Sequence, residues 1–390
     1  MMRIPEQLKK LNWLYAVRCE LRRLKNERRG LWQDAERQFK ENPPEHGDLR
    51  DYRRALCRHR FDYKEYNTYG LWHLDERERM QYLSELELKC IYRKYDSVDE
   101  SRWMDNKLLT HLKFAKYMQR DWICPSVTPF EAFVEFVSSK DCIVKPCKGS
   151  LGKGVFLVKK GSDVDLKALY DDCINNRLLV EECVRGHKEI EEFHPQSLNT
   201  IRMWTMAKNG RFHVVGCMLR MGIGEHVVDN GSVGSILAPI DPKTGAIIGN
   251  GSDKSGHVYP EHPDSGKVIK GFAIPYWEKV IEACKEMASF VPEKVFAGWD
   301  VCVLQNGGIE LIEVNTGPNI MGLQVTHGCG FRQKIQALGN ELLGYDPLRL
   351  ISVWSRPRTS YYEYMCYKKR QRDVNWSLKG YVDALGKNAS

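Results

Sequence analysis

The chain has 390 residues, of which 42% are hydrophobic, 28% charged and 11% aromatic, which is enough to fill two or three domain cores and excludes a disordered or collagen-like protein. Its 59 Lys and Arg against 51 Asp and Glu give a formal charge of +8; residues 1–60 carry +7 and residues 351–390 carry +5, so the stretch between them carries −4. Because the basic character is confined to the two ends, we expect no nucleic-acid partner.

The sequence also bears on the compartment. It has no run of about 20 apolar residues and no apolar stretch near its N-terminus, so we expect neither a membrane-spanning helix nor a signal peptide. Its 13 cysteines are scattered without a CxxC pair, which favours a reducing compartment over disulfides or zinc. We expect a cytoplasmic protein, and peripheral contact of its basic ends with the inner face of the membrane stays open.

Residues 1–103 are predicted to form a helical N-terminal region. Apolar and aromatic residues recur there every three or four positions among charges, in the segments 8–40, 51–74 and 75–95, with a Pro-Pro turn at 43–44. Its tryptophans, tyrosines and arginines would suit stacking on nucleic acid. A solvated arginine face over an aromatic core is the simpler interpretation, because no nucleic-acid motif accompanies these residues.

From about residue 120 the pattern changes to short β-branched runs separated by glycine. Helical segments at 105–119, 131–139 and 275–291 interrupt the strands without a strict β-α alternation, so we predict an α+β fold with antiparallel sheet. This domain is predicted to span 104–345, and a basic C-terminal tail follows over 346–390.

The first segment with chemical character is 142–158. A strand ends in Lys145-Pro146, a loop carries Gly149, Gly152, Lys153 and Gly154, and a second strand follows. Glycines let backbone N–H groups approach phosphate oxygens, and lysines add positive charge. The loop is not a Walker A loop, because glycine follows the lysine where Ser or Thr would be needed. Taken alone, the segment also fits an ordinary surface turn.

The second such segment is 298–318, where two apolar strands flank the turn Gln305–Gly308. Asp300, Glu313 and Asn315 are expected on these neighbouring strands, the last two on one face because strand side chains alternate. Such oxygen ligands suit Mg²⁺, with Mn²⁺ as an alternative. In the competing interpretation, Asp300 pairs with a lysine and Glu313 is an edge charge.

In this order, the segments resemble the ATP-grasp superfamily, in which two α+β lobes clasp ATP. The resemblance covers about 104–330 and implies the ATP-grasp fold, with ATP and Mg²⁺ as cofactors. It implies that residues 179–186 form the hinge beside adenine. The implied nucleotide contacts are Lys107, Lys145, the loop residues Gly149, Gly152, Lys153 and Gly154, the hinge residues Glu181, Glu182 and Val184, and Glu189 at the ribose; the implied metal ligands are Asp300, Glu313 and Asn315.

Within the superfamily, the segments His194–Arg202 and Asp229–Gly234, together with Arg220, are similar to the sugar-transfer-associated group, which is often associated with surface-polysaccharide biosynthesis. The resemblance implies catalytic roles for Asn199, Arg202 and Arg220. One departure is Thr200, since many ATP-grasp ligases have Asp two residues before the arginine. From the residues alone, an exposed surface salt bridge is the alternative for each arginine, and anchoring of a triphosphate or acyl phosphate is favoured over it.

The resemblance implies an ADP-forming carboxylate–amine ligase, in which a substrate carboxylate takes the γ-phosphoryl group of ATP and an amine then displaces phosphate from the acyl phosphate. By analogy, the partners would be a uronic acid and an amine, or an amino acid and an amino sugar, on a nucleotide- or lipid-linked glycan. Two alternatives stay open: a kinase that phosphorylates a sugar or polyol hydroxyl, and a non-enzymatic protein that binds a polyanion or membrane surface through its basic ends.

Overall fold

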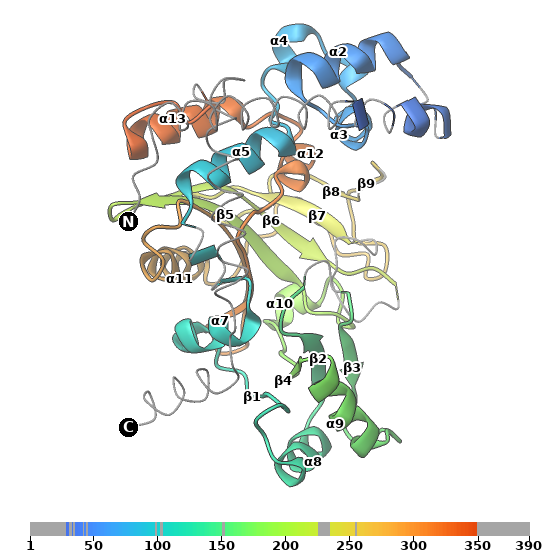
Figure 1. The fold of residues 1–390 in the computed structure, drawn as a ribbon, viewed down its shortest axis with the longest axis vertical. Helices are drawn as coiled ribbons and strands as arrows, with labels where there is room; N and C mark the ends of the chain where they lie inside the picture. The colour runs from blue at the N-terminus through green and yellow to red at the C-terminus, as the bar shows by residue number, and fades with distance from the viewer. Residues whose placement is uncertain are drawn as a thin grey trace, which may run out of the picture.

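The computed structural model describes residues 29–30, 33, 36–41, 43, 46–97, 100–101, 104–149, 153–224, 235–253 and 256–348. Most of the predicted C-terminal tail, the first 28 residues and the segment Asp229–Gly234 lie outside this range. Within it, no helix has the length and apolar character of a membrane span. Two antiparallel sheets with flanking helices confirm the predicted α+β class (Figure 1).

The smaller sheet has four strands. Their order is β1 (Trp122–Ile123), β4 (Leu178–Glu182), β2 (Cys142–Pro146) and β3 (Phe156–Val158). Two amphipathic helices, α8 (Phe130–Ser139) and α9 (Leu166–Asn175), cover it. They bury Phe133 and Cys173 against Val144 and Val180 of the strands, so this lobe has its own core.

The larger sheet has seven strands. Their order is β11 (Ile309–Asn315), β10 (Phe296–Val303), β5 (Thr200–Lys208), β6 (Arg211–Met221), β7 (Ile236–Ile240), β8 (Gly251–Ser252) and β9 (Val258–Tyr259). The predicted hairpin at 298–318 is formed by β10 and β11, which pair antiparallel. Every residue of β10 is buried, since helices cover both faces of the sheet there.

Helices pack on both faces of the larger sheet (Figure 1). One face is covered by α11 (Trp277–Ser289), and the other by α5 (Glu85–Tyr95), α12 (Met321–His327) and α13 (Arg332–Leu343). Leu88 and Ile91 of α5 share a core with Trp204 of β5. This helix of the predicted N-terminal region therefore packs directly on the larger sheet.

The short elements before α5 surround an aromatic core. They are α2 (Leu49–His59), α3 (Tyr63–Thr68), the 3₁₀ turn η1 (Leu71–His73) and α4 (Glu76–Arg79). Tyr52, Phe61 and Tyr66 are buried there, and Met321 and Val325 of α12 pack against them. These aromatic residues thus form a core, as the simpler interpretation predicted; Trp13 and Trp32 lie outside the described residues.

A buried carboxyl group at the start of α3 makes stability depend on pH. Asp62 and Glu65 form a capping box, and Glu65 also accepts the backbone N–H of Glu85 at 2.5 Å. Burial, together with the charge of Asp62, raises the pKa of Glu65 from 4.5 to about 8. The folded protein therefore retains a proton that the unfolded chain releases, and its stability falls as pH rises through this interval.

We expect Glu65→Gln, which cannot ionise, to gain stability relative to the natural protein as pH rises from about 5 to about 8. Melting temperatures of the two proteins across this range measure the effect, which should reach a few degrees at the upper end. The Gln variant loses one hydrogen-bond acceptor at every pH, so only the change with pH bears on the prediction. A difference that is constant or shrinks with pH would show that Glu65 is ionised in the folded state.

Candidate functional site

A cavity of about 1150 Å³ lies between the two sheets. It is lined by Leu157 of β3, Met218 of β6, Leu237 of β7 and Met321 of α12, among others. Most of the predicted site residues line it: Lys107, Lys145, Gly149, Lys153, Glu181, Glu182, Val184, Arg202, Arg220, Asp300, Glu313 and Asn315. Gly154, Glu189 and Asn199 are not among its lining residues, and Gly152 lies outside the described residues.

Lys107 connects the glycine loop to the larger sheet. It begins α7 (Lys107–Lys113), and its backbone N–H donates to the carbonyl of Cys147 at 2.9 Å. Its Nζ donates to the carbonyl of Gly149 at 2.9 Å and lies 3.0 Å from Oε1 of Glu313 on β11. A carboxylate from one lobe and the loop of the other therefore meet at one ammonium group.

The loop after β2 depends on glycine at Gly154. Its φ is +73°, a conformation that other residues rarely adopt, and a Cβ there would lie 3.2 Å from Cγ of Pro146. The turn therefore brings Lys153 back beside the end of β2 before β3 begins. Lys153 is exposed and lines the cavity, so its ammonium group can reach a ligand from the solvent side.

Asp300 lies in a buried cluster with two arginines. Strand register places it opposite Glu313 on β11 and Arg202 on β5. Its carboxylate accepts Nε and Nη2 of Arg202, the latter at 2.8 Å, and lies 3.2 Å from Nη2 of Arg220. Asn315 donates its Nδ2 to the same carboxylate at 3.1 Å. Burial opposes ionisation, yet the two arginines hold the pKa of Asp300 below its usual value.

The oxygen donors of this cluster fit a hard cation. Among the described residues, no group of three or more His, Cys, Asp and Glu side chains forms a metal cage. Glu313, whose side chain is 35% exposed, and Asn315 both line the cavity beside the paired carboxylate of Asp300. One or two carboxylates with substrate phosphates is the donor set in which Mg²⁺ is usually held, so the residues present suit this ion.

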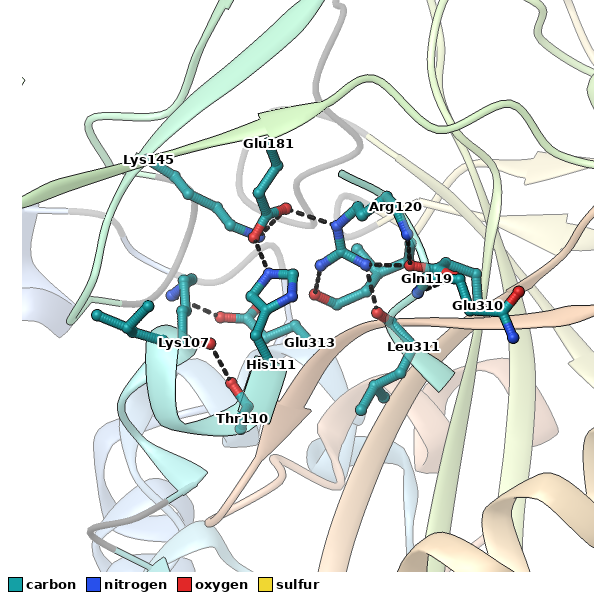
Figure 2. Close-up of polar contacts among 12 residues, drawn as sticks. Lys107, Thr110, His111, Gln119, Arg120, Lys145, Glu181, Glu310, Leu311 and Glu313 are labelled. Atoms are coloured by element: carbon teal, nitrogen blue, oxygen red, sulfur yellow. Dashed lines mark hydrogen bonds and ion pairs between the residues drawn. The ribbon is translucent and has the colours of Figure 1, made fainter. Parts of the chain in front are cut away.

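A buried ionic network centred on Glu181 joins the lobes (Figure 2). Its carboxylate on β4 contacts Nζ of Lys145 at 2.7 Å, Nε of Arg120 at 2.7 Å and Nε2 of His111 at 2.6 Å. Burial would raise the pKa of Glu181, but the charges of Arg120 and Lys145 and the bond from His111 hold it well below the usual value. Lys145 is thus placed by its contact with an ionised carboxylate.

Arg120 extends this network to the larger sheet. Its Nη1 contacts Glu310 of β11 at 2.6 Å and donates to the carbonyl of Leu311 at 2.7 Å. The same carboxylate of Glu310 accepts the backbone N–H of Gln119 at 3.0 Å. One guanidinium group therefore joins β4 of the smaller sheet to β11 of the larger sheet (Figure 2). Its contact on β11, Glu310, lies three residues before Glu313.

The predicted hinge region is also fixed by backbone bonds. Glu182 and Cys183 donate their N–H groups to the carbonyls of Asp121 and Asp141, each at 2.8 Å. A few residues later, His187 donates its N–H to the carbonyl of Val303 on β10 at 2.6 Å. Of the predicted hinge residues, Val184 lies between these two anchors and lines the cavity.

Two predicted site residues lie away from the cavity for identifiable reasons. Asn199 is buried, with its amide nitrogen bonded to the carbonyls of Ile190 and His194 and its oxygen to the N–H of Gly222. Both ends of this amide are therefore used within the fold. Glu189 is exposed on α10 (Lys188–Glu191), whereas Glu191 lines the cavity. Side chains two positions apart in an α-helix point about 200° away from each other, so Glu189 and Glu191 face different sides of α10.

Sequence reasoning missed His111, Arg120, Glu310 and Glu191. Glu310 stands between two apolar residues, which indicated a buried carboxylate that requires a polar or charged partner. Nothing in the sequence identified that partner, since Arg120 lies 190 residues away from Glu310 and 61 from Glu181. The lining residues Lys64 and Thr68 were likewise hidden, as they lie in a region predicted only to be helical.

Comparison with known proteins gives a family match over most of the chain. A family model described as "Sugar-transfer associated ATP-grasp" matches residues 91–340. No curated protein matches the chain.

Three solved structures illustrate the more distant likeness. The ADP complex of PurK, an N5-carboxyaminoimidazole ribonucleotide synthetase, is 11% identical with a TM-score of 0.37, over 56% of this chain and 46% of that one. The ATP-grasp ligase PsnB with its minimal precursor is 14% identical with a TM-score of 0.35, over 59% and 57%. The D-alanine-D-alanine ligase of Coxiella burnetii is 13% identical with a TM-score of 0.36, over 70% and 64%. The chain spans about half the length of the first two.

Proposed function

The chain belongs to the sugar-transfer associated ATP-grasp family, and on this premise we propose that it is an ATP- and Mg²⁺-dependent carboxylate–amine ligase. The observation that carries the proposal is the cavity itself. Lys107 and Glu313 meet there at 3.0 Å, beside a carboxylate held by two arginines. Such a site can neutralise phosphates and an acyl phosphate without a protein nucleophile.

Nucleotide binding is proposed for the part of the cavity next to the smaller sheet. Adenine would contact the hinge backbone at Val184, because the N–H groups of the two preceding residues are already bonded. Glu191 would bind the ribose, in place of the predicted Glu189, because it lines the cavity. Lys107, Lys145 and Lys153 would contact the phosphates, where their positive charges orient and neutralise the transferred group.

Glu313 and Asn315 would hold Mg²⁺ against the nucleotide phosphates, with Asp300 adjacent. The ion would neutralise charge on the phosphates during transfer. In the first step, an oxygen of the substrate carboxylate bonds to the γ-phosphorus as its bond to ADP breaks. In the second, an amine bonds to the acyl carbon, phosphate leaves and the amine loses a proton. Arg202 and Arg220, which share the carboxylate of Asp300, would lie beside these anions and stabilise their charge.

Trapping with hydroxylamine tests the proposal. The protein, ATP, Mg²⁺ and hydroxylamine would be incubated with single carboxylates, namely glucuronic acid, galacturonic acid and the common amino acids. We expect a hydroxamate, formed together with ADP, from at least one of them, because hydroxylamine replaces the amine acceptor. ADP release with a phosphorylated alcohol and no hydroxamate would identify a kinase. Absence of nucleotide binding would favour the non-enzymatic alternative.

The finer parts of the proposal concern substrate and location. We propose a role in surface-polysaccharide biosynthesis, in which the ligase joins an amino acid or amine to a sugar or uronic acid that is nucleotide- or lipid-linked. The name of the family supports this role. A cytoplasmic protein whose basic ends contact the membrane surface would meet such lipid-linked substrates.

A further inference from the structure

The cavity continues past the proposed nucleotide site to the N-terminal helices. Its volume of about 1150 Å³ exceeds the range of about 300–1,000 Å³ usual for one small ligand. The part opposite the smaller sheet, here termed the α3 end, is lined by Lys64, Thr68, Met218, Leu237, Met321 and Val325. Figure 1 shows α3 beside α12 on the larger sheet, with β2 and β3 at the opposite end of the molecule. The α3 end thus offers room for a second ligand.

The wall of the α3 end is firmly attached to the catalytic domain. Gln324 of α12 is fully buried, accepts the N–H of Leu83 at 2.9 Å and donates to its carbonyl at 3.0 Å. The same amide donates to the hydroxyl of Tyr69, directly after α3, at 2.8 Å. Tyr92 of α5 donates to the carbonyl of Pro318 at 2.7 Å, close to the predicted metal ligands. These bonds hold α3 in place over the cavity.

Helix α3 presents one face to its core and another to the cavity. Tyr63 and Tyr66 are buried in the aromatic core. Lys64 and Thr68 are four residues apart, so they lie on one face, and both line the cavity. They also lie outside the family match at 91–340. The α3 side of this wall therefore comes from outside the matched segment.

The floor of the α3 end adjoins the two arginines. Register places Met218 opposite Arg202 and Leu237 opposite Arg220, so these four side chains share one face of neighbouring strands. A Cβ on Gly322 would lie 3.1 Å from Cε of Met218, so glycine lets α12 approach this floor closely. An apolar floor is thus continuous with Arg202 and Arg220, which the proposed function places beside the acyl phosphate.

The rim of the α3 end is polar and of mixed charge, with Lys64, Thr68 and Glu85 around the apolar floor. A molecule that fits it has a C–H face and an edge of hydroxyl groups, as a pyranose ring does. We infer that the α3 end binds the sugar ring of a uronic acid, with its C–H face on Met218 and Leu237 and its carboxylate toward Arg202 and Arg220. This inference rests on the proposed function for the fate of the carboxylate, but the binding itself can be tested separately.

Saturation-transfer NMR on the full chain with Mg²⁺ and the non-hydrolysable ATP analogue AMP-PNP tests the inference. D-Glucuronate is the probe, and we expect saturation of its ring protons. Thr68→Trp, which fills the α3 end, should weaken binding by about fivefold or more while AMP-PNP affinity, measured by calorimetry, stays within about twofold. Lys64→Glu changes only an exposed side chain and should weaken binding in the same direction, which covers the case that the Trp variant fails to fold.

Arg58→Trp is the matched control, because Arg58 lies on α2 with a side chain 64% exposed and outside the cavity lining. It should leave glucuronate binding unchanged. No saturation transfer with the natural protein, or equal binding by the natural protein and both α3 variants, overturns the inference. Binding that the α3 variants abolish supports it even if hydroxylamine traps nothing, in which case the ligase proposal alone fails.

Discussion

Replacing Glu313 with Gln is expected to lower hydroxamate formation by about 100-fold or more while leaving the melting temperature nearly unchanged. The Glu313 side chain is 35% exposed and pairs with Lys107. A partly exposed ion pair of this kind contributes at most about 1 kcal/mol to the free energy of unfolding. Gln retains an oxygen for that lysine but removes the negative charge that would hold Mg²⁺ against the phosphates. Hydroxamate yield and thermal unfolding, measured on the same preparation, give both quantities.

Glu310→Gln is the matched control for this prediction, since it makes the same chemical change on the same strand. Glu310 is 1% exposed and contacts Arg120 at 2.6 Å, so this substitution disturbs a buried ion pair and should lower the melting temperature. The account of Glu313 is wrong if Glu313→Gln retains full activity, or if it destabilises the protein as much as Glu310→Gln does.

Replacing Arg120 with Met is expected to cost about 3–5 kcal/mol of unfolding free energy at neutral pH. Met has a similar length but leaves the carboxylates of Glu181 and Glu310 without the guanidinium that contacts both. Urea denaturation measures the cost. A loss below about 1 kcal/mol would show that the network contributes little to joining the lobes.

The acid dependence of this variant provides a second readout. In the natural protein, the pKa of Glu181 lies well below its usual value of 4.5. The ionised Glu181 therefore contributes to the free energy of unfolding above pH 4.5, and this contribution is lost as pH falls through the lower pKa of the folded state. Without Arg120, one of the charges that depress this pKa is missing. The stability gap between the variant and the natural protein should therefore stay constant near neutral pH and narrow as pH falls below 4.5.

Local patterns were sufficient for much of the fold. The glycine-bounded runs predicted β2, β3 and the β10–β11 hairpin, because strand alternation and turn residues act over a few positions. Packing of α5 on the larger sheet could not be predicted in this way, since it depends on how Leu88 and Ile91 meet residues more than 100 positions away.

The candidate site likewise contains residues that local motifs predict and residues that depend on contacts between distant parts of the chain. The lysines and carboxylates that belong to compact motifs, such as Lys145 and Glu313, could be singled out from the sequence and line one cavity. The partner of Asp300 was harder to predict. Asp300 was expected to bind metal, and only the competing interpretation paired it with a lysine, whereas its partner is an arginine 98 residues away. Glu189 and Glu191 differ only in which side of a short helix they face, and a helix of four residues leaves almost no periodic signal.

The central claim, that an acyl phosphate is formed, is tested most directly by isotope transfer. The carboxylate that gives the largest hydroxamate yield, with glucuronate tried first, is labelled with ¹⁸O in both oxygens and incubated with ATP, Mg²⁺ and an amine. The account predicts that the released phosphate carries one ¹⁸O atom, seen by mass spectrometry, because the carboxylate oxygen that attacks phosphorus departs with it. Unlabelled phosphate, or label retained entirely in a phosphorylated alcohol, would contradict the account.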